Sequence, residues 1–326
     1  MAFLEVKNLH THFFTRRGIV KAVDGVDFQV DRGETFGLVG ESGCGKSMTC
    51  LSILRLVPRP AGQIVEGEIL LEGNDLLKKS EEEMRKIRGS MISMILQDPM
   101  TSLNPVFTVG DQVMESLKIH LGLRGKVLWD KATTMLGMVR IASPEVRLKN
   151  WPHQLSGGMR QRVVGAISLS CEPRLLIADE PTTSLDATIQ MQYLRLLREI
   201  QEETGLTLIF ITHDLGIVAR MCKRAAVMYA GKIVETATVR DLFNHPAHPY
   251  TQALLRSVPK VEENVARLAS IEGQPPSLHK LPPHCIFAPR CSWAYDQCWK
   301  EAYPPQVQLD EDHLVNCWKY TQVGKR

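Results

Sequence analysis

Residues 36–54, FGLVGESGCGKSMTCLSIL, place a glycine-rich turn between an apolar strand and a helical run. The turn itself, GESGCGKS at 40–47, matches the whole pattern G-x-x-x-x-G-K-[ST]. Glycines let the backbone wrap closely around phosphates with its N–H groups pointing inward, and the helix start adds the positive end of its dipole. A chance glycine-rich turn is the alternative, but the full match makes it weak. The feature therefore predicts a phosphate-binding loop in an α/β domain.

Two side chains of this loop have specific predicted roles. Lys46 supplies a point charge to the β- and γ-phosphates of a nucleotide, and Ser47 Oγ can ligate Mg²⁺. Cys44 is interpreted as a small tolerated residue rather than a redox switch. The nucleotide-binding residues predicted in the loop are Gly40, Glu41, Ser42, Gly43, Cys44, Gly45, Lys46 and Ser47.

Length and charge narrow the class of protein. A chain of 326 residues can form two domains or one elaborated domain. The net charge of +3 is too slight to indicate nucleic-acid binding. No segment approaches the roughly 18 apolar residues of a spanning helix, and the start, MAFLEVKNLHTHF, predicts a strand rather than a signal peptide. We therefore expect a cytosolic chain whose thiols are reduced.

A second carboxylate-bearing stretch, PRLLIADEPTTSLD, occupies residues 173–186. Its apolar run at 175–178 suits a buried strand of a parallel sheet. Asp179 and Glu180 follow at the strand end, where open α/β sheets bind ligands. Asp179 is placed to hold Mg²⁺, and Glu180 to orient and polarise an attacking water. Two merely exposed carboxylates are the weaker interpretation beside a phosphate loop.

The stretch LSGGMRQR, residues 155–162, resembles the signature motif of ATP-binding-cassette (ABC) ATPases. Ser156 suits a helix N-cap, and Gly157 and Gly158 expose backbone N–H groups at a second anion-binding helix start. In that family, this motif contacts the ATP held by the phosphate loop of a partner subunit. The resemblance therefore implies that two cassettes together make complete ATP sites.

Other family landmarks follow from the same resemblance. Gln97 in MILQDPMTSLNP matches the Q-loop, which reaches Mg²⁺ and the water, and Ser184-Leu185-Asp186 matches the D-loop. His213 in LIFITHDL matches the switch histidine that contacts the γ-phosphate. The aromatic residue that stacks on adenine is assigned to Phe14, with Phe13 as the alternative. The resemblance implies Lys46, Gln97, Glu180 and His213 as the catalytic residues.

The implied fold class is α/β, a P-loop NTPase cassette with a parallel core sheet, an antiparallel flank and a helical subdomain at about 98–160. Helices are expected at about 109–121 and 130–140. The resemblance spans residues 1–258, the predicted nucleotide-binding domain. The proline-rich stretch EGQPPSLHKLPPHC indicates a domain boundary. Residues 259–326 are then a small cysteine-rich C-terminal extension.

Four of the eight cysteines lie in this extension, at Cys285, Cys291, Cys298 and Cys317. Structural zinc sites usually contain tight C-x2–4-C pairs, which are missing from this spacing. Four thiolates without histidine are also the ligand set of a 4Fe–4S cluster. So short a segment could hardly bury a core of its own, so a metal centre would brace it. The spacing favours a cluster over zinc without excluding zinc.

The extension is similar to the C-terminal region of oligopeptide/dipeptide (peptide/nickel) importer ATPases. The match lies in HPYTQALL, residues 248–255, and CIFAPRC, residues 285–291. Some members of that subfamily carry a 4Fe–4S cluster on four such cysteines. The resemblance therefore implies a structural cluster on Cys285, Cys291, Cys298 and Cys317.

The resemblance implies an ATP-hydrolysing subunit that energises solute import from the cytoplasmic face of a membrane, with ATP and Mg²⁺ as cofactors. Its implied partners are a second ATPase subunit (a paralogue or a copy), two transmembrane permeases and an external solute-binding protein, with no nucleic acid. Two alternatives stay open: a soluble ABC ATPase acting on nucleic acid or ribosomes, and a redox- or metal-sensing regulatory ATPase. The sequence does not distinguish peptide from nickel or another cargo.

Overall fold

The computed structural model describes residues 2–183, 185–258 and 270–321. The predicted boundary at 258/259 and Ser184 of the predicted D-loop therefore fall wholly or partly outside the described residues. The chain divides into two compact units. Unit 1 comprises Met1–Val30, Thr35–Leu77 and Thr212–Arg326, and unit 2 comprises Asp31–Glu34 and Lys78–Ile211. Each unit is described by itself.

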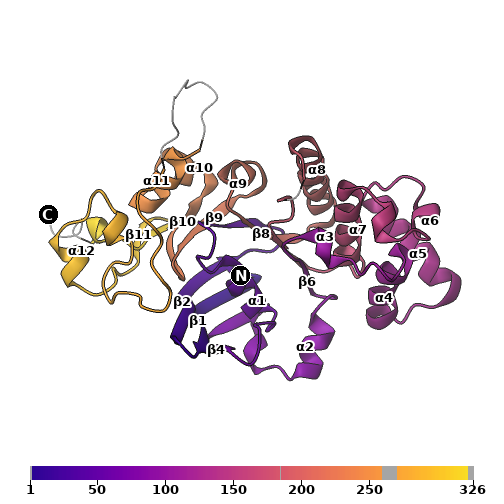
Figure 1. Cartoon of the computed structure of the whole chain (residues 1–326), viewed down its shortest axis with the longest axis horizontal. Coiled ribbons are helices and arrows are strands. Elements are labelled where there is room, and N and C mark those ends of the chain that lie inside the picture. Colours follow the sequence, from indigo (N-terminus) through magenta and orange to yellow (C-terminus); the bar gives the residue numbers. More distant parts are fainter. Residues whose placement is uncertain (1, 184, 259–269, 322–326) are drawn as a thin grey trace. The chain divides into compact units, whose positions relative to one another are not determined.

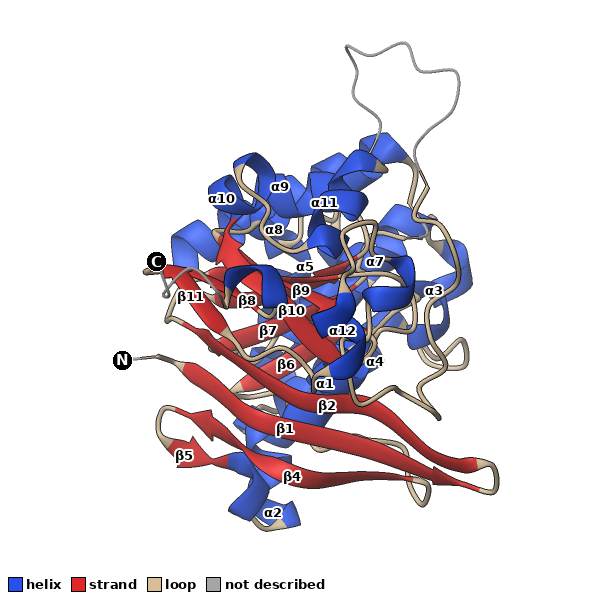
Figure 2. Ribbon diagram, turned by 90° about the vertical axis from the view of Figure 1, so that its left-hand side faces the viewer, coloured by secondary structure: helices blue, strands red, loops and turns tan. Residues whose placement is uncertain are grey.

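Unit 1 contains an antiparallel sheet with the strand order β2-β1-β4-β5 (Figure 2). Its strands are β1 (Leu4–Thr15), β2 (Gly18–Val30), β4 (Gly62–Leu71) and β5 (Asn74–Asp75). β1 pairs along almost its whole length with β2 on one side and β4 on the other. The expected antiparallel flank is therefore present.

The strand that leads into the phosphate loop, β3 (Thr35–Val39), also lies in unit 1 and pairs in parallel with β9 (Arg224–Tyr229). Every residue of both strands is buried, which explains why they are apolar after their first residues, Thr35 and Arg224. β10 (Lys232–Thr238) continues antiparallel to β9.

The C-terminal segment extends this arrangement with two strands that the sequence did not predict. β12 (His313–Val315) pairs antiparallel with β10, and β11 (Val307–Asp310) pairs antiparallel with β12. Both strands are short, and three of the four residues of β11 are exposed, so their sequence carries little alternation of apolar and polar residues.

The C-terminal segment shares a core with the rest of unit 1. Ile286 and Phe287 are buried in one cluster with Tyr229 of β9 and Tyr250. A segment this short buries its apolar side chains against an existing core because it cannot form one alone. The helical elements of unit 1 are α1 (Lys46–Ile53), α9 (Leu215–Met221), α10 (Val239–Asn244), α11 (Pro249–Arg256), η3 (Ala288–Arg290), α12 (Asp296–Lys300) and η4 (Trp318–Tyr320).

Unit 2 contains the parallel strands β6 (Ile92–Ile95), β7 (Leu175–Asp179) and β8 (Thr207–Thr212), paired in the order β6-β7-β8. Its main helices gather beside one another in Figure 1. They are α4 (Val109–Leu121), α5 (Gly125–Met138), α6 (Pro144–Arg147) and α7 (Gly157–Leu169), with α8 (Ala187–Thr204) following β7. Shorter elements are α2 (Glu81–Ile87), α3 (Pro99–Ser102) and η2 (Pro152–Gln154), and η1 (Leu76–Lys78) lies where the units meet in sequence.

The two helices expected in this part of the chain are present. The first has the expected bounds because Thr108 forms a capping box with Asp111 at its start and Gly122 ends it in the left-handed conformation. The second, α5, begins at Gly125 rather than near residue 130, and no side chain caps its start. Within the part of the chain that the structure describes, no helix combines the length and the apolar character that crossing a membrane requires.

Candidate nucleotide-binding site

The phosphate loop, residues 40–47, connects β3 to α1 through backbone conformations that require glycine. Gly40 has φ +152° and Gly45 has φ +109°. A Cβ on Gly40 would lie 2.2 Å from the carbonyl oxygen of Met228, and one on Gly45 would lie 2.3 Å from that of Ala22. Neither oxygen can move away easily because both belong to the backbone. The two glycines therefore let the loop lie directly against β2 and β9.

Lys46 closes the loop from inside. Its side chain is buried, and Nζ donates to the carbonyl oxygens of Gly40 at 2.8 Å and Glu41 at 3.0 Å. These bonds hold the ammonium within the curve of the loop, where a phosphate group would meet it. Ser42 and Gly43 at the loop tip are exposed, and Ser47 is half-buried in the first turn of α1. Cys44 is buried, and this burial raises the pKa of its thiol, as expected for a packing residue.

Two residues that the sequence did not single out contact this loop. Tyr250 of α11 accepts a hydrogen bond from the Glu41 backbone N–H at 2.9 Å. Arg290 of η3 binds both carboxylate oxygens of Glu41, at 2.8 Å and 3.0 Å. Tyr250 lies in the stretch HPYTQALL and Arg290 in CIFAPRC. These stretches carry the resemblance to the importer family, but they do not by themselves indicate a role for either residue.

The predicted catalytic carboxylate lies in unit 2. Glu180 directly follows β7 and adopts φ +43°, a conformation that non-glycine residues seldom adopt outside functional or strained sites. Its Oε2 accepts from Gln97 Nε2 at 3.4 Å and from Thr183 Oγ1 at 3.1 Å. The structure thus brings together two of the predicted catalytic residues, Gln97 and Glu180. Asp179 is buried at the end of β7.

The signature stretch forms the start of a helix, as predicted from its residues. Ser156 is the N-cap of α7, and its Oγ accepts from the Met159 N–H at 3.3 Å. A Cβ on Gly158 would lie 2.8 Å from Ile189 of α8, so a glycine here allows the two helices to approach closely. Asp186 caps α8 by accepting from the N–H groups of Thr188 and Ile189.

Two further predicted residues lie on the surface of unit 1. His213 follows β8 directly and is exposed, next to Asp214, which caps α9. Phe14 lies near the β1–β2 turn with 45% of its surface exposed, whereas Phe13 is half-buried with its ring close to Gly62. The nucleotide roles of these residues stay predictions, as does the choice of Phe14 over Phe13.

Comparison with known families matches two regions of the chain. Residues 23–183 match the family described as ABC transporter. Residues 234–298 match the family described as oligopeptide/dipeptide transporter, C-terminal region.

Curated relatives cover nearly the full length. The chain is 52% identical to the dipeptide transport ATP-binding protein DppD of Bacillus subtilis, over 98% of this chain and 95% of the relative. It is 49% identical to the oligopeptide transport ATP-binding protein AppD of the same organism, over 98% of each chain. The chain belongs to the ABC transporter ATP-binding proteins of the oligopeptide/dipeptide family.

Solved structures agree with this family. The ATP-binding cassette MJ0796 in a dimeric post-hydrolysis state bound to ADP and Pi aligns with a TM-score of 0.65 and 26% identity, covering 73% of this chain and 99% of that chain. CbiO1 from Clostridium perfringens aligns with a TM-score of 0.64 and 28% identity, covering 75% of this chain and 91% of that one. The fold is thus the ABC ATPase cassette, and the chain is an ATP-hydrolysing ABC protein.

The four C-terminal cysteines of this ABC protein line one cavity of about 160 Å³. They come from four separate segments, before η3, at its end, in α12 and before η4. Aromatic side chains complete the wall, with Phe287, Trp293, Tyr295 and Trp318 beside His248. The fold therefore gathers the predicted ligand set in one largely apolar place.

Burial raises the pKa of the Cys285 thiol to about 12, although the N–H groups of Phe287 and Ala288 stabilise its thiolate. Burial likewise raises the pKa of the Cys291 and Cys317 thiols, whereas the backbone N–H groups of Trp293 and Lys319 act in the opposite direction. Buried thiols of this kind stay protonated unless a cation compensates their charge.

Unit 1 contains another group of side chains that could ligate a metal, namely His10, His12 and Asp24. One ligand atom of each lies within 4.8 Å of the others. Burial opposes ionisation of Asp24, but Lys232 at 3.0 Å and Lys21 at 3.4 Å lower its pKa below its ordinary value. Two ammonium groups already compensate the negative charge of this carboxylate. We therefore interpret the three residues as part of a charge network rather than as a metal site.

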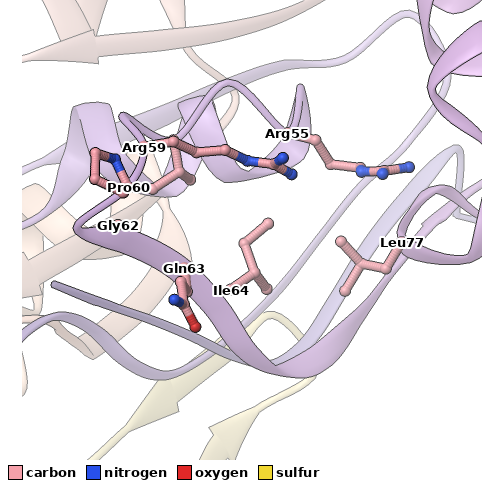
Figure 3. Close-up of a pocket in the computed structure, with 8 residues that line it drawn as sticks. Arg55, Arg59, Pro60, Gly62, Gln63, Ile64 and Leu77 are labelled. Atoms are coloured by element: carbon pink, nitrogen blue, oxygen red, sulfur yellow. The ribbon is translucent and has the colours of Figure 1, made fainter. Parts of the chain in front are cut away.

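A pocket of about 560 Å³ lies beyond the C-terminal end of α1 (Figure 3). The side chains of Arg55 and Arg59 lie on one side, and those of Ile64 and Leu77 on the other. None of the residues that line it belongs to the predicted nucleotide site.

Proposed function

We propose that this chain energises the import of peptides through a membrane ABC transporter by hydrolysing ATP. The observation that carries the proposal is the glycine-dependent phosphate loop around Lys46 in a chain whose full-length relatives are dipeptide and oligopeptide transport proteins. This likeness also favours transport over the nucleic-acid and sensor alternatives. Peptide cargo stands ahead of nickel because the relatives are named for peptide transport.

In the proposed reaction, Lys46 neutralises charge on the terminal phosphates while the loop N–H groups bind their oxygens. Ser47, Asp179 and Gln97 would hold Mg²⁺, because their side chains offer oxygen atoms, the ligands that this ion prefers. The bound ion would compensate negative charge on the phosphates. Glu180 accepts the proton of the attacking water, and the Gln97 amide and Thr183 hydroxyl orient its carboxylate. His213 contacts the γ-phosphate after closure.

The proposed assembly pairs two cassettes, so that Ser156, Gly157 and Gly158 of one serve the nucleotide of the other. The partner cassette is a paralogue or a copy. Two transmembrane permeases couple closure to transport, an external solute-binding protein delivers cargo, and nucleic acid has no part. The chain would then act at the cytoplasmic face of the membrane as a peripheral subunit.

We further propose that Cys285, Cys291, Cys298 and Cys317 hold a 4Fe–4S cluster. Their shared cavity is roughly ten times the space that a single water needs. The backbone N–H groups of Phe287 and Trp293 lower the pKa of Cys285 and Cys291, and hydrogen bonds to ligand sulfurs are one of the ways in which proteins tune such clusters. The cluster would brace the C-terminal segment.

The experiment that tests the transport proposal uses the chain assembled with its membrane subunits in vesicles. Peptide uptake should require ATP and be lost with Lys46→Ala in this chain. If vesicles accumulate peptide equally with the wild-type and Lys46→Ala chains, the proposed function is wrong. ATP hydrolysis stimulated by nucleic acid instead of by a loaded binding protein would favour the alternative class.

A further inference from the structure

Glu41, the second residue of the phosphate loop, is held through its N–H, its carbonyl oxygen and its carboxylate. Its N–H donates to Tyr250 Oη, its carbonyl oxygen accepts from Lys46 Nζ, and its carboxylate is bound by both terminal nitrogens of Arg290. Within the loop itself, the same carbonyl oxygen also accepts from the Cys44 N–H at 3.3 Å. The contacts with Tyr250 and Arg290 come from the C-terminal part of the chain, more than 200 residues away in sequence.

The side chain of Arg290 is itself held by several contacts and is almost fully buried. Its side chain is 4% exposed, against 27% for Glu41. Besides Glu41, its nitrogens donate to the carbonyl oxygens of Glu272 at 2.9 Å and Ile271 at 3.4 Å, and to Tyr229 Oη at 3.4 Å. The ion pair with Glu41 raises the pKa of the guanidinium further. A planar guanidinium anchored on several sides is a rigid, bidentate holder of a carboxylate.

Aromatic packing connects this contact to the cysteine-lined cavity. Tyr250 packs on Tyr229 with ring centroids 4.6 Å apart. The ring centroid of Phe287 lies 5.4 Å from that of Tyr250 and 5.2 Å from that of Tyr229. Phe287 also lines the cavity, and Arg290 directly precedes Cys291. The residues that hold the loop are thus part of the same packed body as the proposed ligands.

We propose that Arg290 is a positioning residue for nucleotide binding, acting through Glu41. It fixes the loop before phosphate arrives, which lowers the conformational entropy lost on binding. It also neutralises a carboxylate that would otherwise repel the triphosphate. The inference rests on the proposed phosphate site. It adds that the C-terminal segment, through Arg290, raises the affinity of that site for the nucleotide.

The test measures the dissociation constant of MgATP for the full-length chain, with equal metal loading of all variants. Arg290→Met should weaken binding about tenfold, because it leaves the Glu41 carboxylate uncompensated beside the phosphates. Arg290→Lys, which keeps the charge but not the bidentate geometry, should weaken binding by about threefold. In the assembled transporter, the effect should fall on KM more than on kcat. Arg240→Met, at an exposed position in α10, is the matched control and should bind as the wild type does.

A double substitution separates this role from a merely structural one. Glu41→Gln removes the repulsion, so Arg290→Met/Glu41→Gln should bind ATP more tightly than Arg290→Met alone, within about threefold of the wild type. If the double variant binds as weakly as Arg290→Met, or if Arg290→Met binds as the wild type does, the inference is wrong. Should Arg290→Met not fold, the outcome for Arg290→Lys decides: binding equal to the wild type overturns the inference. Unaltered ATP binding by Lys46→Ala would instead show that the proposed phosphate site itself is misassigned.

Discussion

The side-chain amide of Gln97 lies 3.4 Å from Oε2 of Glu180, and Thr183 donates to the same oxygen. Glu180 follows β7 with φ +43°, so the backbone and two hydrogen-bond donors together determine where its carboxylate points. A general base needs this kind of orientation, since small displacements of a catalytic group cost large factors in rate.

Replacing Gln97 with alanine should slow ATP hydrolysis by about tenfold or more, because the Glu180 carboxylate loses one of the donors that orient it. The measurement is the steady-state ATPase rate of the assembled transporter at saturating ATP. Gln308→Ala, at an exposed position of β11, is the control and should hydrolyse ATP at the wild-type rate. A wild-type rate for Gln97→Ala would mean that this contact has no catalytic part.

Gly45→Ala should abolish measurable ATP binding and destabilise unit 1, because its Cβ would lie 2.3 Å from the Ala22 carbonyl oxygen at φ +109°. The cost in free energy of unfolding should be about 1–3 kcal/mol, as for other overpacked sites. Gly137→Ala in α5 is the control, because nothing lies within 4 Å of its Cβ position and a helical alanine stabilises. Thermal unfolding and ATP binding would be measured together, and normal binding by Gly45→Ala would contradict the loop geometry.

Glu235 of β10 should be a major contributor to the stability of unit 1. It is fully buried and accepts from the N–H groups of Ala247 and His248 and from His313 Nε2, all within 2.9 Å. Glu235→Ala leaves these groups unpaired and should lower the free energy of unfolding by about 3 kcal/mol. Glu311→Ala, at an exposed turn, should change it little. Equal denaturation midpoints for the two variants would show that the buried network contributes nothing.

Metal content tests the proposed cluster. Anaerobically purified protein should contain iron and acid-labile sulfide in equal amounts, and Cys298→Ser should lose both, because Cys298 lines the cavity. Cys222→Ser is the control outside the cavity and should keep them. Stoichiometric zinc without iron would rule the cluster out. Since Arg290 directly precedes Cys291, the loss of iron should also weaken ATP binding.

The sequence predicted those parts of the molecule whose signals are local. The phosphate loop, the cap at Ser156 and the buried strands β3 and β7 each depend on a few consecutive residues. Arg290 and Glu41 are 249 residues apart, and no pattern in either stretch indicates that they meet. β11 and β12 were missed because they are short and gain their stability from pairing with β10 and with each other.

The most direct test of the central claim is ATP hydrolysis by the Glu180→Gln chain assembled with its membrane subunits. The variant should still bind ATP, because Lys46 and the loop N–H groups are unchanged, but its hydrolysis should fall by about 10²–10⁴-fold. Hydrolysis at the wild-type rate by a Glu180→Gln protein that binds ATP normally would contradict the assignment of Glu180 as the catalytic base.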